Sequence, residues 1–93
     1  MDWIHVEGDN RGQVVLYALS TCGWCKKTKQ LLDELGVEYR YKYVDMAFGK
    51  EREELLDEVR QWNPQSSFPT VVVNGEKSII GYKPDRVKEE LGL

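Results

Sequence analysis

The spacing of apolar residues changes from one side of a short cysteine motif to the other, and this change limits the folds that the chain can adopt. Residues 14–19, VVLYAL, form an unbroken apolar run rich in strand-forming residues, which is typical of a buried central strand. Beyond the motif the spacing becomes that of one helix face, at Thr28, Leu31, Leu32 and Leu35. Gly36 then stands where a left-handed helix cap is expected. From Val37 to Val44 the pattern alternates, with one face made of Tyr39, Tyr41 and Tyr43. The three segments predict a β-α-β unit, in which a right-handed crossover connects parallel strands.

Two further helices are predicted downstream. One covers about residues 50–62 and is ended by Asn63-Pro64. Its inner face consists of Leu55, Leu56, Val59 and Trp62. The other begins near Pro84, because proline suits the first turn of a helix. Its inward-facing residues are Val87 and Leu91.

Between these helices the sequence predicts a β-hairpin. Pro69 precedes the strand-forming segment 70–73, and Asn74-Gly75 is a strong signal for a two-residue turn. The return strand is expected from Lys77 to Gly81. The order of elements is therefore β-α-β-α-β-β-α, an α/β fold with a four-stranded mixed sheet and helices on both faces.

The length and the N-terminal segment define the expected domain organisation. A chain of 93 residues makes one domain, which we assign to residues 1–93. Residues 1–12 are treated as an N-terminal extension. Within it, Trp3 to Val6 is expected to form an extra edge strand beside residues 40–44, and Gly8 to Gly12 a turn. His5, the only histidine, is expected to face solvent.

The composition argues against several functional classes. A net charge of -3 does not fit the clustered Lys and Arg of nucleic-acid-binding proteins. No apolar run approaches the roughly 20 residues that span a membrane, and the N-terminus does not resemble a signal peptide. Two cysteines and one histidine are too few for a structural zinc site within one subunit. We therefore expect a cytoplasmic monomer that binds neither nucleic acid nor membrane.

The two cysteines, Cys22 and Cys25, lie where the first core strand meets the helix. Three residues apart on a helix, their sulfurs share one face and are close enough to form a disulfide. The helix N-terminus has unsatisfied amides and a partial positive charge, which favours a thiolate at Cys22. Lys26 and Lys27 follow at once and are candidates for stabilising that thiolate. A Cys-x-x-Cys pair in a β-α-β unit predicts thiol–disulfide exchange, in which Cys22 attacks a substrate disulfide and Cys25 resolves the mixed disulfide.

Three motifs extend this interpretation: Cys-Gly-Trp-Cys at 22–25, Ser-Phe-Pro-Thr at 67–70 and Gly-Tyr-Lys-Pro-Asp at 81–85. In combination they resemble the glutaredoxins, over about residues 13–92. The resemblance implies a thioredoxin fold in which Pro69 is cis and its loop lies against Cys22. It also implies that the backbone of Phe68 pairs with an extended substrate. The substrate-binding residues implied by the resemblance are Gly23, Trp24, Phe68, Pro69, Thr70, Gly81, Tyr82 and Asp85.

The sequence departs from the pattern of glutathione-using members at three places. Leu19 stands where those proteins usually carry Lys or Arg, and Ser67-Phe68 replaces Thr-Val. Tyr82 replaces the second glycine of a Gly-Gly pair, whereas Asp85 is retained. The C-terminal motif is similar to the Gly-Phe-Arg-Pro-Asp of glutaredoxin-like redoxins that supply ribonucleotide reductase. Those redoxins take electrons from a flavoprotein reductase.

The resemblance therefore favours a reductant of protein disulfides, with ribonucleotide reductase as a candidate partner and a flavoprotein disulfide reductase as electron donor. No cofactor is expected beyond the redox-active Cys22–Cys25 disulfide. Trp24 is expected to be exposed, close to Tyr82, and to anchor partner proteins. Two alternatives stay open: a glutathione-dependent glutaredoxin, and a dimer that bridges a [2Fe–2S] cluster through the first cysteine of each subunit and two glutathione thiols. Gly23-Trp24 is similar to the arrangement in such cluster carriers.

Overall fold

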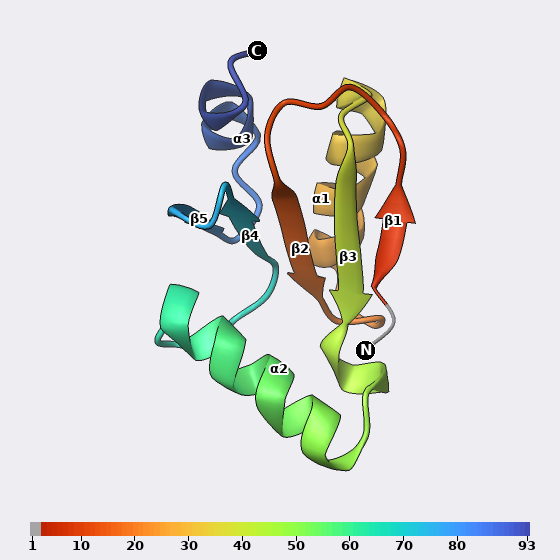
Figure 1. Ribbon diagram of the computed structural model, residues 1–93, viewed down its shortest axis with the longest axis vertical. Helices are drawn as coiled ribbons and strands as arrows, with labels where there is room; N and C mark the ends of the chain where they lie inside the picture. The colour runs from red at the N-terminus through yellow and green to blue at the C-terminus, as the bar shows by residue number, and fades with distance from the viewer. Residues whose placement is uncertain (1–2) are drawn as a thin grey trace.

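The unbroken apolar run of the sequence forms β2 (Val14–Ala18), a fully buried strand at the centre of a five-stranded sheet. The computed structural model in Figure 1 describes residues 3–93. The other elements along the chain are β1 (Ile4–Val6), α1 (Gly23–Leu35), β3 (Tyr39–Tyr43), the 3-10 helix η1 (Val44–Met46), α2 (Gly49–Trp62), β4 (Thr70–Val73), β5 (Lys77–Ile80) and α3 (Pro84–Glu90). The strand order is β1-β3-β2-β4-β5. This is the α/β, thioredoxin-like architecture that the sequence predicts, with the N-terminal edge strand present.

The directions of the strands determine at which edge of the sheet α1 and η1 begin. Strand β2 pairs parallel with β3 and antiparallel with β4, and β4 pairs antiparallel with β5. The carboxyl ends of β2 and β3 therefore lie at the same edge of the sheet, at the lower end in Figure 1. Helix α1 begins at this edge, and η1 leaves β3 there.

The N-terminal extension adds its strand where the sequence analysis expects it. Strand β1 pairs antiparallel with β3, with His5 opposite Arg40. His5 is exposed, and its Nε2 lies 3.5 Å from a Glu38 carboxylate oxygen. The segment after β1 also contacts the end of α1, because the Asp9 backbone N–H donates to the Gly36 carbonyl at 2.8 Å. A side chain at Gly8 would meet that carbonyl at 2.6 Å, so this approach requires glycine.

Helices on both faces of the sheet divide the core into two clusters. On the face covered by α1 and α3, the buried residues include Leu16, Leu32, Tyr39, Val71, Val87 and Leu91. On the face covered by α2 they include Val15, Tyr17, Leu55, Val59 and Val72. Successive side chains of β2 and β4 point to opposite faces of the sheet, and helices cover both faces. The two strands are therefore apolar throughout and show no alternation of apolar and polar residues in the sequence. Within the part of the chain that the structure describes, we find no helix with the length and hydrophobicity needed to cross a membrane.

Local signals fix the ends of most elements, and the differences from the prediction lie at strand ends and in the hairpin turn. Gly36 adopts the left-handed conformation with φ of 68°, and Pro84 is the first residue of α3, as predicted. Val44 leaves the predicted strand and begins η1. The hairpin turn has three residues rather than two, because Val73 pairs with Lys77. Asn74 donates its backbone N–H to the Gln13 carbonyl at 2.7 Å, and its side-chain oxygen accepts the Gln13 backbone N–H at 2.9 Å. The return strand begins at Lys77 as predicted and ends at Ile80 instead of Gly81.

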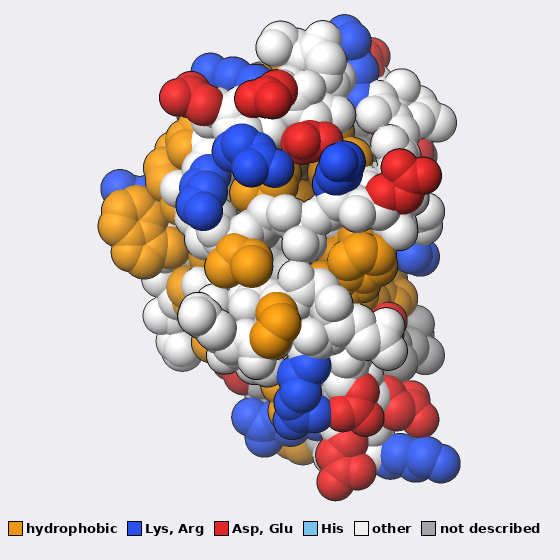
Figure 2. Space-filling view, turned by 90° about the vertical axis from the view of Figure 1, so that its left-hand side faces the viewer, with side chains coloured by type: hydrophobic (Ala, Val, Ile, Leu, Met, Phe, Trp, Pro, Cys, Tyr) orange, Lys and Arg blue, Asp and Glu red, His pale blue; other side chains and the backbone are white. Residues whose placement is uncertain are grey.

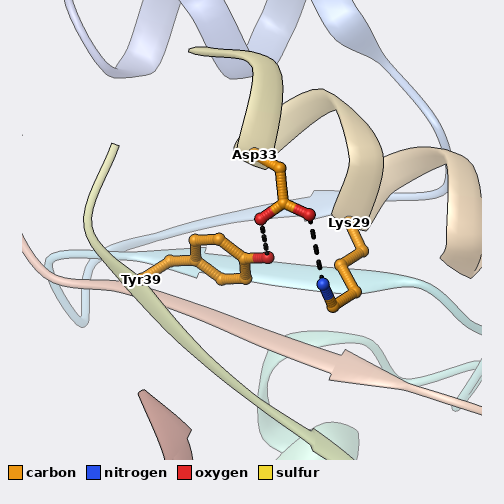
Figure 3. Close-up of polar contacts among 3 residues, drawn as sticks. All are labelled: Lys29, Asp33 and Tyr39. Carbon is orange, nitrogen blue, oxygen red and sulfur yellow. Dashed lines mark hydrogen bonds and ion pairs between the residues drawn. The ribbon is translucent and has the colours of Figure 1, made fainter. Parts of the chain in front are cut away.

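A polar contact joins α1 to β3 at the edge of the first core cluster. The Tyr39 hydroxyl donates to one carboxylate oxygen of Asp33, and Lys29 Nζ lies 3.1 Å from the other (Figure 3). The Tyr39 side chain is almost completely buried, whereas Asp33 is exposed. The carboxylate therefore satisfies a hydroxyl that the core cannot hydrate, and it holds the helix against the strand.

We expect Tyr39→Phe to lower the free energy of unfolding by about 1.5–3 kcal/mol, because it removes a buried hydrogen bond to a charged acceptor. Burial, followed by the Asp33 hydrogen bond, also raises the pKa of Tyr39. An unfolded tyrosine ionises at about pH 10, whereas Tyr39 is still neutral at that pH. The contribution of Tyr39 to the free energy of unfolding is therefore complete below about pH 10 and is lost as the pH rises above it. Urea unfolding followed by circular dichroism at neutral and alkaline pH measures both effects.

The matched control is Tyr41→Phe on the same strand face, whose hydroxyl makes no hydrogen bond within residues 3–93. Equal stability losses in the two variants would contradict this account of the Asp33 contact.

Candidate active site

Cys22 is the N-cap of α1 and sits directly after the turn that leaves β2. Its backbone is extended, with φ of -92° and ψ of 119°. Its sulfur accepts the backbone N–H of Cys25 at 3.2 Å, and its own backbone N–H donates to the Leu19 carbonyl at 3.2 Å. The sulfur therefore satisfies one of the free amides at the helix N-terminus, where a negative charge is favoured. Cys22 is also partly exposed, so a substrate disulfide can reach it.

Cys25 lies one turn into α1 and is buried, with only 1% of its surface exposed. Its sulfur accepts the Leu19 backbone N–H at 3.5 Å. Burial, followed by its hydrogen bond with Cys22, raises the pKa of Cys25 to about 12. The charges of Cys22 and Asp45 act in the same direction. Cys25 is therefore held as a neutral thiol behind the exposed Cys22, and both cysteines are free.

An aromatic pair stands beside the two cysteines. Trp24 is 57% exposed, and its ring stacks on that of Tyr82 with centroids 5.6 Å apart and planes inclined by 29°. Lys27 Nζ lies 4.9 Å from the centre of the Trp24 ring. The expected neighbourhood of Trp24 and Tyr82 is thus present, although the two residues come from α1 and from the loop between β5 and α3.

The Trp24–Tyr82 pair forms one wall of an apolar cavity. The cavity has a volume of about 260 Å³ and is lined by Trp24, Phe68, Pro69, Gly81 and Tyr82. Figure 2, which faces the side of the molecule with β5 and α3, shows apolar side chains in a band between charged ones. Five of the predicted substrate-binding residues thus meet at one place. None of the five carries a charge, so the cavity suits an apolar group.

The loop before β4 presents its backbone at this cavity. The Phe68–Pro69 peptide bond is cis, as the resemblance implies. Within residues 3–93 no hydrogen bond uses the Phe68 backbone N–H or carbonyl. The Phe68 side chain and Cys22 both pack against the first core cluster. A free donor and acceptor beside an exposed nucleophile are what an added strand of substrate requires.

Asn63, which the sequence indicates only as the end of a helix, holds this loop in place. Its side chain is fully buried, and its Nδ2 donates to the Ser67 carbonyl at 3.0 Å and to Thr70 Oγ1 at 3.2 Å. The Thr70 hydroxyl in turn donates to the Ser67 carbonyl at 2.9 Å. Thr70 is therefore buried under the loop and supports it rather than facing the cavity. The sequence signal that Asn63 offers is weak, because asparagine before proline is common at helix ends.

The remaining predicted site residues do not line the cavity. Gly23 and Lys26 are exposed on the first turn of α1, and Asp85 is exposed on the first turn of α3. In the described part of the chain, the side chains of Lys26 and Asp85 make no hydrogen bond or ion pair. Leu19 is half-buried and packs against the second core cluster. Its apolar side chain thus belongs to the core.

Comparison with known proteins agrees with this site. The sequence profile of the family described as Glutaredoxin matches residues 14–78. The solved glutaredoxin from Methanosarcina mazei Go1 is 54% identical, with 98% of this chain and 88% of that chain covered and a TM-score of 0.92. The methanoredoxin of Methanosarcina acetivorans is 46% identical, with 92% and 90% covered and a TM-score of 0.90. The "Gene 56 protein" of Mycobacterium phage D29 is 34% identical over 76 residues, which are 82% of this chain and 79% of that protein. The chain therefore belongs to the glutaredoxin family of thiol–disulfide oxidoreductases, with Cys22 and Cys25 as its dithiol pair.

Proposed function

We propose that this protein reduces the disulfides of other proteins in the cytoplasm, and that a flavoprotein or similar disulfide reductase, rather than glutathione, restores its dithiol. The observation that carries this proposal is the uncharged aromatic cavity lined by Phe68, Tyr82 and Trp24, the last of which stands between the two cysteines in the chain. Aromatic side chains with large exposed surfaces are typical anchors for protein partners. The similarity of the 81–85 motif to redoxins that supply ribonucleotide reductase supports the same choice and makes that enzyme a candidate partner.

The exchange transfers two electrons from the dithiol to the substrate. The Cys22 thiolate attacks one sulfur of the substrate disulfide, a Cys22–substrate S–S bond forms, and the second substrate sulfur leaves as a thiolate. Cys25 then loses its proton to solvent and attacks Cys22. The bond between Cys22 and the substrate breaks, the substrate leaves as a second thiolate, and the Cys22–Cys25 disulfide remains. The reductase later returns two electrons.

The structure supports this order of events. Cys25 stays protonated in the resting dithiol because burial and the neighbouring Cys22 both oppose its ionisation. Once Cys22 is part of a mixed disulfide, its sulfur is bonded to the substrate and carries no negative charge. One of the groups that raise the pKa of Cys25 in the free dithiol is then removed at the stage when the Cys25 thiolate is needed.

A polypeptide substrate suits the apolar cavity and the free backbone groups of Phe68 better than glutathione does. The free backbone groups of Phe68 can pair with an extended segment, and the cavity can receive an apolar side chain next to the substrate cysteine. Glutathione carries carboxylates, and two features disfavour it. Leu19 supplies no cation, and the Tyr82 ring occupies space where other members have glycine.

Iodoacetamide at neutral pH should alkylate Cys22 first, because Cys22 is partly exposed at the helix N-terminus whereas Cys25 is buried and protonated. Peptide mass spectrometry after short reaction times measures the order. Faster labelling of Cys25 would reverse the two roles.

Wild-type protein should catalyse the reduction of insulin disulfides by dithiothreitol, and Cys22→Ser should not. Cys25→Ser should instead trap a mixed disulfide with the substrate, because the thiol that releases it is gone. Precipitation of the insulin B chain and non-reducing electrophoresis report the two outcomes. Equal rates for wild type and Cys22→Ser would refute the proposal.

With glutathione and glutathione reductase, the wild type should turn over slowly, and Leu19→Lys with Tyr82→Gly should turn over faster. A charge-assisted hydrogen bond to a carboxylate contributes about 1.5–3 kcal/mol, or about 10- to 150-fold in affinity. The matched control is Leu19→Met with Tyr82→Phe, which keeps the apolar packing and the ring. Fast wild-type turnover that neither double variant changes would support the glutathione-dependent alternative.

A further inference from the structure

Ser20 and Asp45, which the sequence does not single out, are joined by two hydrogen bonds beside the cysteines. One carboxylate oxygen of Asp45 accepts the Ser20 backbone N–H at 2.9 Å, and the other accepts the Ser20 hydroxyl. Asp45 belongs to η1, whereas Ser20 lies in the turn between β2 and α1, just before Cys22. A carboxylate that holds both donors of one residue makes a charge-assisted, two-point contact. The turn before Cys22 is therefore tied to η1, the 3-10 helix that follows β3.

The turn that Asp45 holds is also the one that aligns the two sulfurs. Leu19, next to Ser20, contacts both cysteines: its carbonyl accepts the Cys22 N–H at 3.2 Å, and its N–H donates to Cys25 Sγ at 3.5 Å. Loosening Ser20 would loosen Leu19, and the attack of one sulfur on the other depends on their alignment.

Asp45 also acts on Cys25 through its charge. It is one of the groups that raise the pKa of Cys25, after burial and Cys22. The hydrogen bond from the Ser20 hydroxyl lowers the pKa of Asp45 itself, and Arg52 of α2 acts in the same direction, so Asp45 is ionised at neutral pH. Unlike the charge of Cys22, that of Asp45 persists in the mixed disulfide.

We propose that Asp45 is a positioning residue of the disulfide exchange: through its two hydrogen bonds to Ser20 it holds the Leu19–Cys22 turn in the geometry for resolution. This inference rests on the proposed two-cysteine route. In the resolving step Cys25 releases its proton to solvent, its sulfur bonds to Cys22, and the substrate sulfur leaves with the electron pair of the broken bond. Asp45 is chemically unchanged throughout.

The test is a single turnover of the fully reduced protein with an aromatic disulfide whose released thiolate is coloured. The first release reports the attack of Cys22, and the second reports resolution by Cys25. Measured across pH, the second release gives a plateau rate, which reflects alignment, and a midpoint, which reflects the ionisation of Cys25. The variants are Asp45→Asn and Ser20→Ala. The matched control is Asp57→Asn, an exposed aspartate on α2 that pairs with Arg60.

Asp45→Asn should lower the plateau rate about fivefold, the change that corresponds to one hydrogen bond, and should move the midpoint to lower pH. Ser20→Ala should lower the plateau less and leave the midpoint in place, because the Asp45 charge and its bond to the backbone N–H remain. Asp57→Asn should match the wild type in both quantities.

A wild-type plateau rate in Asp45→Asn would overturn the proposal, and so would a wild-type midpoint, since a purely structural role would leave the ionisation of Cys25 unchanged. If Asp45→Asn fails to fold, a wild-type plateau in Ser20→Ala would overturn it. A wild type that shows the first release but never the second would refute the two-cysteine route itself, and so remove the basis of the inference.

Discussion

The rest of the site depends on one contact, the acceptance of the Cys25 backbone N–H by the sulfur of Cys22. This bond makes the nucleophile a part of the secondary structure, because the sulfur serves as the N-cap of α1. The buried strand β2 and the packing of α1 against the sheet fix both ends of the connection. The Cys22 sulfur thereby stays in the electrostatic field of the helix N-terminus. Cys25 stays one helical turn behind it, so both cysteines are positioned by regular secondary structure.

Three segments far apart in the chain build the surface around that sulfur. Trp24 comes from α1, Phe68 from the loop before β4, and Tyr82 from the loop after β5. Their cavity exists because β2 and β4 are neighbours in the sheet, so the loops at their ends converge. Buried Asn63 fixes the middle segment through hydrogen bonds that no water could replace in the core. The shape of the cavity therefore depends on the order of the strands in the sheet as much as on the aromatic residues that line it.

The electrostatic surroundings of the two cysteines differ, and this difference sets the order in which they react. Burial and negative neighbours keep Cys25 neutral, whereas Cys22 faces a helix terminus and solvent. Two chemically identical side chains three residues apart thus take different roles, and the difference comes from their surroundings alone. The link between Asp45 and Ser20 places part of those surroundings on a different element, the 3-10 helix η1.

Features that depend on short-range spacing can be predicted from the sequence. They include the apolar run of β2, the helix face ending at Gly36, the proline that opens α3 and the cysteine spacing. Each of them extends over about one or two helical turns, so local patterns reveal it. Features that join residues distant in the chain become visible in the folded protein alone. The bond between Ser20 and Asp45, the burial of Asn63 and the three-residue turn at Asn74, whose partner is Gln13, have no local signature. Such contacts arise from strand register and sheet order, and the polar residues that make them look, in the sequence, like ordinary turn and surface residues.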